Sequence, residues 1–204
     1  MVNYLKPKTK SMKKQLLVLM FVILSLNTFS QSSESPKVTF TAGYGLVTVP
    51  QIIEGVSDIL TTGVTAGQVY FDDAKFSGAI ILGVKFKVND KLTLGVDGIY
   101  EKFTKKAYNA SDNSHIGDSK GSYVTVLPRA DYYWLNGSLF RLYSGVGLGV
   151  SFAQQKFAAD KDNKTILAFN ATPIGTEIGT KFCVFGEASF GYNGLLSMGI
   201  RLRL

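Results

Sequence analysis

Apolar and polar side chains alternate along residues 195–204 of this chain. One face of the segment is apolar, and the other is polar or small. The apolar face carries Leu196, Met198, Ile200, Leu202 and Leu204, and the other face carries Ser197, Gly199, Arg201 and Arg203. A period of two is the side-chain period of an extended strand, so this pattern predicts a β-strand.

The same alternation recurs upstream, which gives eight predicted strands. They span residues 37–46, 76–88, 92–105, 123–134, 139–153, 164–179, 182–193 and 195–204. Asn136-Gly137 is typical of a tight hairpin turn. The apolar phase slips at Pro173, which predicts a β-bulge there. An even number of half-apolar strands predicts an all-β fold, an eight-stranded antiparallel up-and-down transmembrane barrel.

The lengths of the connections predict which rim faces outward. Three linkers are short, at 89–91, 135–138 and 180–181, and three are long, at 47–75, 106–121 and 154–163. Short periplasmic turns and longer extracellular loops are typical of outer-membrane barrels, although the link at 193–194 is also short.

The first long loop contains apolar residues at helical spacing. Ile52, Val56 and Ile59 follow Pro50, with Ile53 and Leu60 alongside. This spacing predicts a short amphipathic helix resting on the mouth of the barrel. Covering the mouth is its simplest role, and binding a partner is the alternative.

The N-terminus has the pattern of a secretory signal peptide over residues 1–30. Lys13 and Lys14 precede an apolar run at 16–24, and a polar stretch with small residues follows. We expect cleavage before Gln31 and a barrel domain over 31–204. A transmembrane helix is disfavoured because it needs about 20 apolar residues. Met12 starts a more ordinary signal than Met1, so it is a candidate true start.

Removing this segment changes the charge balance. Five of the 22 basic residues and none of the 15 acidic residues lie in 1–30, which leaves 17 against 15, a net charge of +2. The basic excess therefore gives no argument for nucleic acid binding. A single cysteine, Cys183, excludes an internal disulfide.

A soluble eight-stranded barrel, such as a lipocalin-like binder, has the same period and must be weighed. Two features favour the membrane. The polar face is rich in glycine, which is costly in a strand unless it makes room inside a narrow tube. The apolar face carries aromatic residues near both strand ends, as membrane girdles do. The expected girdles are Phe86, Tyr132, Trp134, Phe140 and Phe182 at the short-turn rim, and Tyr44, Tyr100, Phe152, Phe169 and Tyr192 at the loop rim.

The inward face of the predicted barrel is charged with both signs. It carries Lys85, Lys87, Arg129, Arg141, Arg201 and Arg203 against Asp97, Glu101, Asp131, Glu177 and Glu187. The interior of an eight-stranded barrel is just wide enough for side chains to fill. Because buried charges must pair, we expect a salt-bridge network that plugs the lumen. The alternative is a narrow ion path whose selectivity these charges set.

The sequence contains few residues in arrangements typical of catalysis or metal binding. His115 has Ser114, Asp112 and Asp118 nearby, so a triad can be imagined, but the stretch is predicted to be an exposed loop tip. Lipid A deacylase barrels instead place His and Ser on a strand face. Asp72-Asp73, and Asp160 with Asp162, lack the spacing of a calcium loop. The sequence predicts no catalytic residues, no metal site and no cofactor.

Three segments resemble the small "outer membrane protein β-barrel domain" family, which includes the OmpA and OmpX types. They are residues 125–134, 142–149 and 185–191. The resemblance implies an outer-membrane location, contact with outer-membrane lipids and lipopolysaccharide, and insertion by the barrel assembly machinery. That machinery reads the last strand, which ends in many members on an aromatic residue and here on Leu204. The peptidoglycan-binding domain of OmpA-type proteins is not expected.

The function expected from the sequence is non-enzymatic. The long loops would contribute to envelope integrity or to surface interactions such as adhesion, and the protein would be a monomer. The alternatives left open are a narrow ion or small-solute channel, a soluble binder and a lipid A-modifying enzyme.

Overall fold

The computed structural model describes residues 37–54, 69–109, 111–112, 114–157 and 160–204, and these form one antiparallel barrel. Its strands are β1 (Val38–Leu46), β2 (Val69–Phe76), β3 (Ala79–Lys87), β4 (Leu92–Asn109), β5 (His115–Asn136), β6 (Phe140–Phe157), β7 (Asp160–Gly179), β8 (Phe182–Gly191) and β9 (Leu196–Arg203). The predicted signal peptide and its cleavage site lie outside the described residues.

The barrel closes with eight strand positions. Its order runs β4-β3-β1-β9-β8-β7-β6-β5, and β5 pairs back with β4. β2 pairs with β4 beyond the end of β3, so β2 and β3 together occupy one position. Between them Gly78 has φ +74°, and a Cβ there would lie 2.3 Å from the Tyr44 hydroxyl. This break divides the strand predicted at 76–88.

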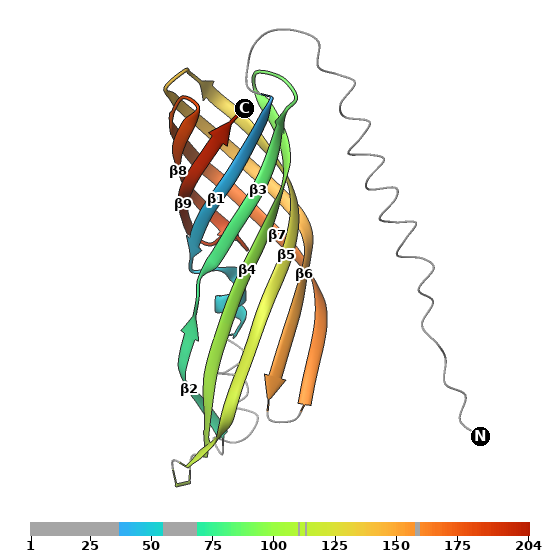
Figure 1. Ribbon diagram of the computed structural model, residues 1–204. Helices are drawn as coiled ribbons and strands as arrows, with labels where there is room; N and C mark the ends of the chain where they lie inside the picture. The colour runs from blue at the N-terminus through green and yellow to red at the C-terminus, as the bar shows by residue number, and fades with distance from the viewer. Residues whose placement is uncertain (1–36, 55–68, 110, 113, 158–159) are drawn as a thin grey trace, which may run out of the picture. The chain divides into compact units, whose positions relative to one another are not determined.

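The strands have unequal lengths, and this produces two different rims (Figure 1). Short turns join β3 to β4, β5 to β6 and β7 to β8 at one rim, where the C-terminus also lies. At the other rim, β4 to β7 continue far beyond the ends of β1, β8 and β9. The loops predicted at 106–121 and 154–163 are therefore mostly strand, which corrects the sequence-based assignment.

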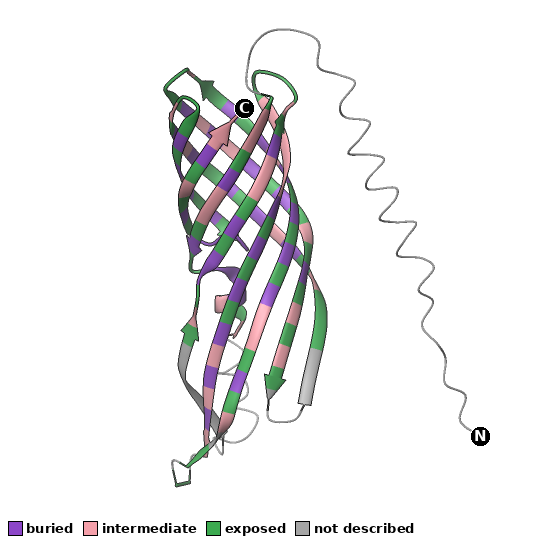
Figure 2. Ribbon diagram, viewed as in Figure 1, coloured by how far each residue is buried: buried purple, intermediate pink, exposed green. Residues whose placement is uncertain are grey.

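Buried and exposed residues alternate along the strands (Figure 2). Most of the exposed positions of the barrel wall are large apolar residues, whereas polar and charged residues are buried inside. Along β6, Val146, Leu148 and Val150 are exposed, whereas Gly145, Gly147 and Ser151 are buried. Leu148 is 67% exposed and Leu167 on β7 is 72% exposed. So wide an apolar surface would be unfavourable in water and is favourable in contact with lipid. The predicted eight-stranded all-β barrel is confirmed. Within the described ranges, no helix is long and apolar enough to cross a bilayer.

The outer aromatic residues form two levels, with one correction. Nine of the ten predicted girdle residues face outward: Tyr44, Phe86, Tyr100, Tyr132, Trp134, Phe140, Phe152, Phe169 and Phe182. Tyr192 is 2% exposed and packs in the interior. β8 ends at Gly191, whose φ of +151° breaks the alternation. Phe190 takes the outward place, and its ring centroid lies 5.7 Å from that of Phe169.

Register shifts mark bulges in the long strands, one of them between Ala107 and Tyr108 of β4, near the tip of its hairpin with β5. The one predicted at Pro173 is present, because the β7 register with β8 shifts between Ala171 and Ile174. The β5 register with β6 also shifts, between Tyr133 and Leu135, which the sequence did not indicate.

A short helical segment at 49–54 follows β1, as predicted for the first loop. Thr48 caps it, because the Gln51 amide donates to the Thr48 hydroxyl at 3.3 Å. Its orientation differs from the prediction. Ile52 and Ile53 are exposed, and polar side chains face the barrel instead. The predicted continuation through Val56, Ile59 and Leu60 lies outside the described residues.

Candidate functional site

The lumen of the membrane-spanning part is filled by paired charges. Arg129 of β5 occupies the middle of the cluster. Its guanidinium lies 3.0 Å from the Asp97 carboxylate, 2.6 Å from Asp131 and 3.2 Å from Glu187. Lys85 of β3 reaches the other oxygen of Asp131 at 2.5 Å. Strands β3, β4, β5 and β8 are therefore joined across the tube.

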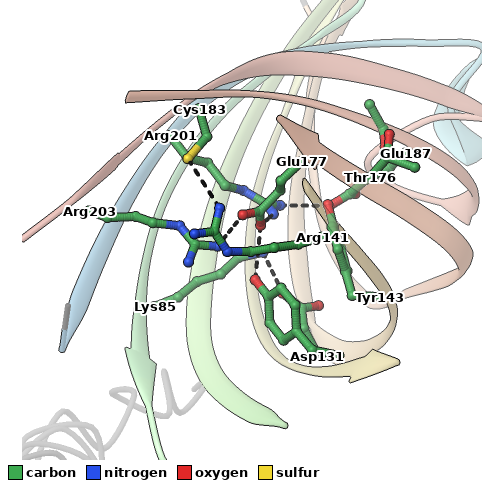
Figure 3. A network of polar contacts seen from close by, with 12 residues as sticks. Lys85, Asp131, Arg141, Tyr143, Thr176, Glu177, Cys183, Glu187, Arg201 and Arg203 are labelled. Atoms are coloured by element: carbon green, nitrogen blue, oxygen red, sulfur yellow. Dashed lines mark hydrogen bonds and ion pairs between the residues drawn. The ribbon is translucent and has the colours of Figure 1, made fainter. Parts of the chain in front are cut away.

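A second set of pairs lies nearer the short-turn rim (Figure 3). Arg201 of β9 lies 2.8 Å from Glu187 and also pairs with Glu177 of β7. Arg203 pairs with the second oxygen of Glu177. All of these groups are buried or nearly so, and Glu187 links the two sets because it contacts both Arg129 and Arg201.

Tyrosine rings complete the cluster. The Tyr143 hydroxyl donates to Glu187 at 2.7 Å, and the Tyr133 hydroxyl donates to Glu177 at 2.9 Å. The Arg201 guanidinium carbon lies 4.9 Å from the centroid of the Tyr143 ring. Flat contact with an aromatic face stabilises a guanidinium that has lost its water.

Inward glycines explain how so many long side chains fit. A Cβ on Gly145 would lie 2.2 Å from an Asp131 carboxylate oxygen and 2.9 Å from Arg129. A Cβ on Gly83 would lie 2.2 Å from an oxygen of Asp97. The glycine-rich inner face predicted from the sequence therefore leaves the volume that the charged side chains occupy.

The central cluster is electrically balanced. It contains four bases and four acids: Lys85, Arg129, Arg201, Arg203, Asp97, Asp131, Glu177 and Glu187. Burying a charge is tolerated only when pairing and hydrogen bonding offset its lost hydration. Removing any one member therefore leaves the charge of a buried partner without its counter-charge. This arrangement is best suited to a fixed plug that fills the lumen.

Three residues predicted for the network bind groups outside this cluster, although one of them, Arg141, is the register partner of Glu177. Lys87 pairs with Asp90 at 2.7 Å in a turn at the short-turn rim. Arg141 donates to the backbone carbonyls of Ser138 and Gly179 at 2.9 Å each. Glu101 lies toward the other rim in contacts of its own. The eleven predicted residues thus separate into a central cluster and two rims.

The sequence did not indicate the polar layer at the mouth. Glu101 accepts hydrogen bonds from the Thr48 hydroxyl at 2.7 Å and from the side-chain amide of Gln51 at 2.6 Å. One turn later, Glu54 lies 2.7 Å from the Lys105 ammonium and accepts from the Tyr123 hydroxyl at 2.5 Å. The helical segment 49–54 is therefore held in the mouth by side-chain hydrogen bonds. Gln51 and Glu101 are 50 positions apart, and no pattern in the sequence indicates that they are in contact.

Above the mouth, the long strands continue as an open sheet, β2-β4-β5-β6-β7. Its concave side is aromatic. The Phe103 ring centroid lies 6.2 Å from that of Phe76 and 5.8 Å from that of Tyr123. Residues 160–169 of β7 extend past β8, whose last register partner is Asn170. Among the described residues, β2 pairs along β4 alone.

The groups considered for catalysis lie at the tip of the β4–β5 hairpin. His115 Nε2 lies 2.9 Å from Asp118, and Ser114 donates to Asp112 at 2.6 Å. These two hydrogen bonds go to different carboxylates, and all four side chains are exposed. The hydrogen bond to His115 lowers the pKa of the Asp118 carboxyl. This geometry is that of a surface turn stabilised by local hydrogen bonds.

Metal ligands do not gather in the described part of the chain, which contains no group of three His, Cys, Asp or Glu side chains that could hold an ion. The side chains of Asp72, Asp73, Asp160 and Asp162 lie outside what the structure describes.

Compared by sequence, the chain matches no known family profile and no curated protein. Among solved structures it is similar to the N-terminal β-barrel domain of OprF from Pseudomonas aeruginosa, with 10% identity, a TM-score of 0.49 and coverage of 84% of this chain and 100% of that one. It is also similar to Ail, the attachment invasion locus protein of Yersinia pestis, with 10% identity, a TM-score of 0.39 and coverage of 84% and 96%. These values carry no argument about activity, which rests on the residues described above.

Proposed function

We propose that this protein is a non-enzymatic outer-membrane barrel that acts at the cell surface through its protruding sheet. The role would be in adhesion or another surface interaction, or in envelope integrity. The barrel body serves as the anchor, and its balanced cluster of buried charges makes it rigid.

The observation that carries the proposal is the pair of sheet edges above the mouth. Among the described residues, strand β2 on one side pairs with β4 alone, and residues 160–168 of β7 on the other side pair with β6 alone. Free edges accept an added strand from an extended polypeptide, which is a common mode of recognition. An anchor alone needs no strands of 18 to 22 residues.

Truncating the protrusion tests this function. Lys102 is the register partner of Ser122, and Gln154 is that of Asn163, so tight turns can replace 103–121 and 155–162 while the remaining strands keep their register. Cells that express the truncated protein should lose adhesion to coated and uncoated surfaces, or should become sensitive to detergents. If both properties survive while the protein is still inserted, the protrusion is not the functional part.

The channel alternative requires a path through the central cluster. Because Arg129 touches three carboxylates from three strands, we expect no steady conductance in planar bilayers. A stable open level in the purified protein would favour the channel. Recovery of the protein from the soluble periplasm, rather than the outer membrane, would contradict both membrane functions.

A further inference from the structure

The outer face of the protruding sheet carries a row of lysines in register. Lys75 of β2 pairs with Thr104 of β4, Thr104 with Lys120 of β5, and Lys120 with Lys156 of β6. Lys161 of β7 holds the next register position. Directly paired residues share a face, so Lys75 and Lys156 face outward like Lys120, and the side chains of all three are exposed.

Like charges directly opposite one another destabilise a sheet. Lys120 and Lys156 are such a pair, with side chains that are both exposed. The row above is different, because there the acidic Asp118 of β5 is the register partner of Lys106. Asp118 also reaches Lys120, but only at 3.5 Å and with 39% of its side chain exposed. The lysine row therefore carries an excess of positive charge at one level.

The height of this row places it beside the lipid headgroups. Thr104 lies four residues beyond Tyr100, a member of the outer aromatic girdle on the same strand face. At about 3.3 Å per residue and a tilt of about 40°, that separation is about 10 Å along the membrane normal. Lys102 bridges the interval, with its ammonium 5.5 Å from the Tyr100 ring centroid. The headgroup layer extends about 5–8 Å beyond the hydrocarbon, so the backbone of the row lies just past its outer edge, and the long lysine side chains can extend back to the phosphates.

We propose that Lys75, Lys120 and Lys156 bind the phosphate groups of an outer-leaflet glycolipid. A phosphate between two lysines replaces their repulsion by charge-assisted hydrogen bonds, and the lipid chains would lie against the barrel below Tyr100. This inference rests on the membrane orientation in the proposed function, but it is independent of adhesion.

The test uses the purified, folded protein in a neutral detergent. Native mass spectrometry measures retention of bisphosphorylated lipid A by the parent and by a Lys75→Ser/Lys120→Ser/Lys156→Ser variant. The matched control, Lys37→Ser/Lys91→Ser/Lys181→Ser, removes three exposed lysines from the opposite rim. We expect the parent and the control to bind alike and the first variant to bind at least about tenfold more weakly.

Two further ligands distinguish the source of the phosphate. Dephosphorylated lipid A should be retained as weakly by the parent as by the variant. Inorganic phosphate at the concentration of the lipid should not displace it. Equal retention of both lipid forms, equal binding by parent and variant, or displacement by inorganic phosphate would each overturn the proposal.

The single variant Lys156→Glu keeps the proposal testable if the triple variant does not fold. It replaces the repulsion with Lys120 by attraction and keeps the pair of Lys120 with Asp118, so its unfolding temperature in neutral detergent should rise above that of the parent. Addition of bisphosphorylated lipid A should then stabilise the parent more than the variant. Equal stabilisation of the two would refute the inference, while the adhesion test above stays unaffected.

Discussion

The indole nitrogen of Trp134 lies 2.8 Å from the Ser144 hydroxyl and donates a hydrogen bond to it. The same hydroxyl donates to the carbonyl of Pro173 at 2.5 Å. Ser144 lies opposite both bulges, since the β6 register shifts around it against β7 and the β5 register shifts at Trp134. One side chain thus satisfies the polar groups that two neighbouring bulges leave at the outer surface.

Replacing Ser144 should affect both bulges. We expect Ser144→Ala to lower the free energy of unfolding by about 1–3 kcal/mol, because the Pro173 carbonyl loses its partner. The chain has one tryptophan, so fluorescence reports this site alone, and its emission should shift. Ser138→Ala in the adjacent turn is the control. An unchanged emission maximum would contradict the hydrogen bond.

The buried cluster should depend on Glu187. Glu187→Gln leaves Arg129 and Arg201 without a shared carboxylate, and breaking a buried pair costs about 3–5 kcal/mol. Urea unfolding in phospholipid vesicles measures this loss. Asp90→Asn breaks only the exposed pair with Lys87, which solvent screens, so its free energy of unfolding should stay close to that of the parent. Similar losses for the two variants would mean that the cluster does not stabilise the barrel.

The lipid-facing surface should reject charge according to depth. Leu148→Arg should lower the free energy of unfolding by about 2–4 kcal/mol, because Leu148 lies outward below the girdle residue Phe152. Gln154→Arg, on the same face but beyond Phe152, should cost about 0–1 kcal/mol. The same vesicle titration compares them. Equal stability of the parent and Leu148→Arg would indicate that this face is not in the membrane.

The helical segment at the mouth should loosen when its cap is removed. Thr48→Val removes the hydroxyl that donates a hydrogen bond to Glu101 and accepts one from the backbone amide of Gln51. Cap loss costs about 0.5–2 kcal/mol, so amide exchange at 51–54 should become about 2- to 30-fold faster. Exchange in β9 should not change. Equal acceleration in both places would indicate global destabilisation rather than release of the helix.

The barrel could be predicted from the sequence because lipid imposes a pattern on it. Every second residue from Leu142 to Phe152 is apolar or small on the outward side, and the inward glycines repeat with the same period. The bulge at Pro173 was visible for a similar reason, since proline lacks an amide donor and the apolar phase changes there. The bulge at Trp134 has neither a proline nor a clear change in the apolar phase, because Trp134 and Leu135 are both apolar and both exposed at the rim.

The protruding strands were missed because they lie outside the lipid. Beyond Tyr100 both faces of β4 can be polar, as Lys102 and Glu101 show, so the period of two disappears from the hydropathy. The mouth contacts were missed for a different reason. Glu54 meets Lys105 and Tyr123 only after the chain has closed into a tube, and nothing local to Glu54 indicates such partners.

The pairing of β1 with β9 has a consequence for the order of assembly. Eight register pairs, from Thr39–Arg203 to Leu46–Leu196, join residues that are 150 to 164 positions apart in the chain. Such non-local contacts form slowly, because the chain loses the entropy of loop closure before the contacts begin to stabilise it. Until then each of the two strands exposes an unpaired backbone edge that invites aggregation. Folding of this chain therefore ends with a single sealing step, and the time spent before that step is when the protein most needs protection.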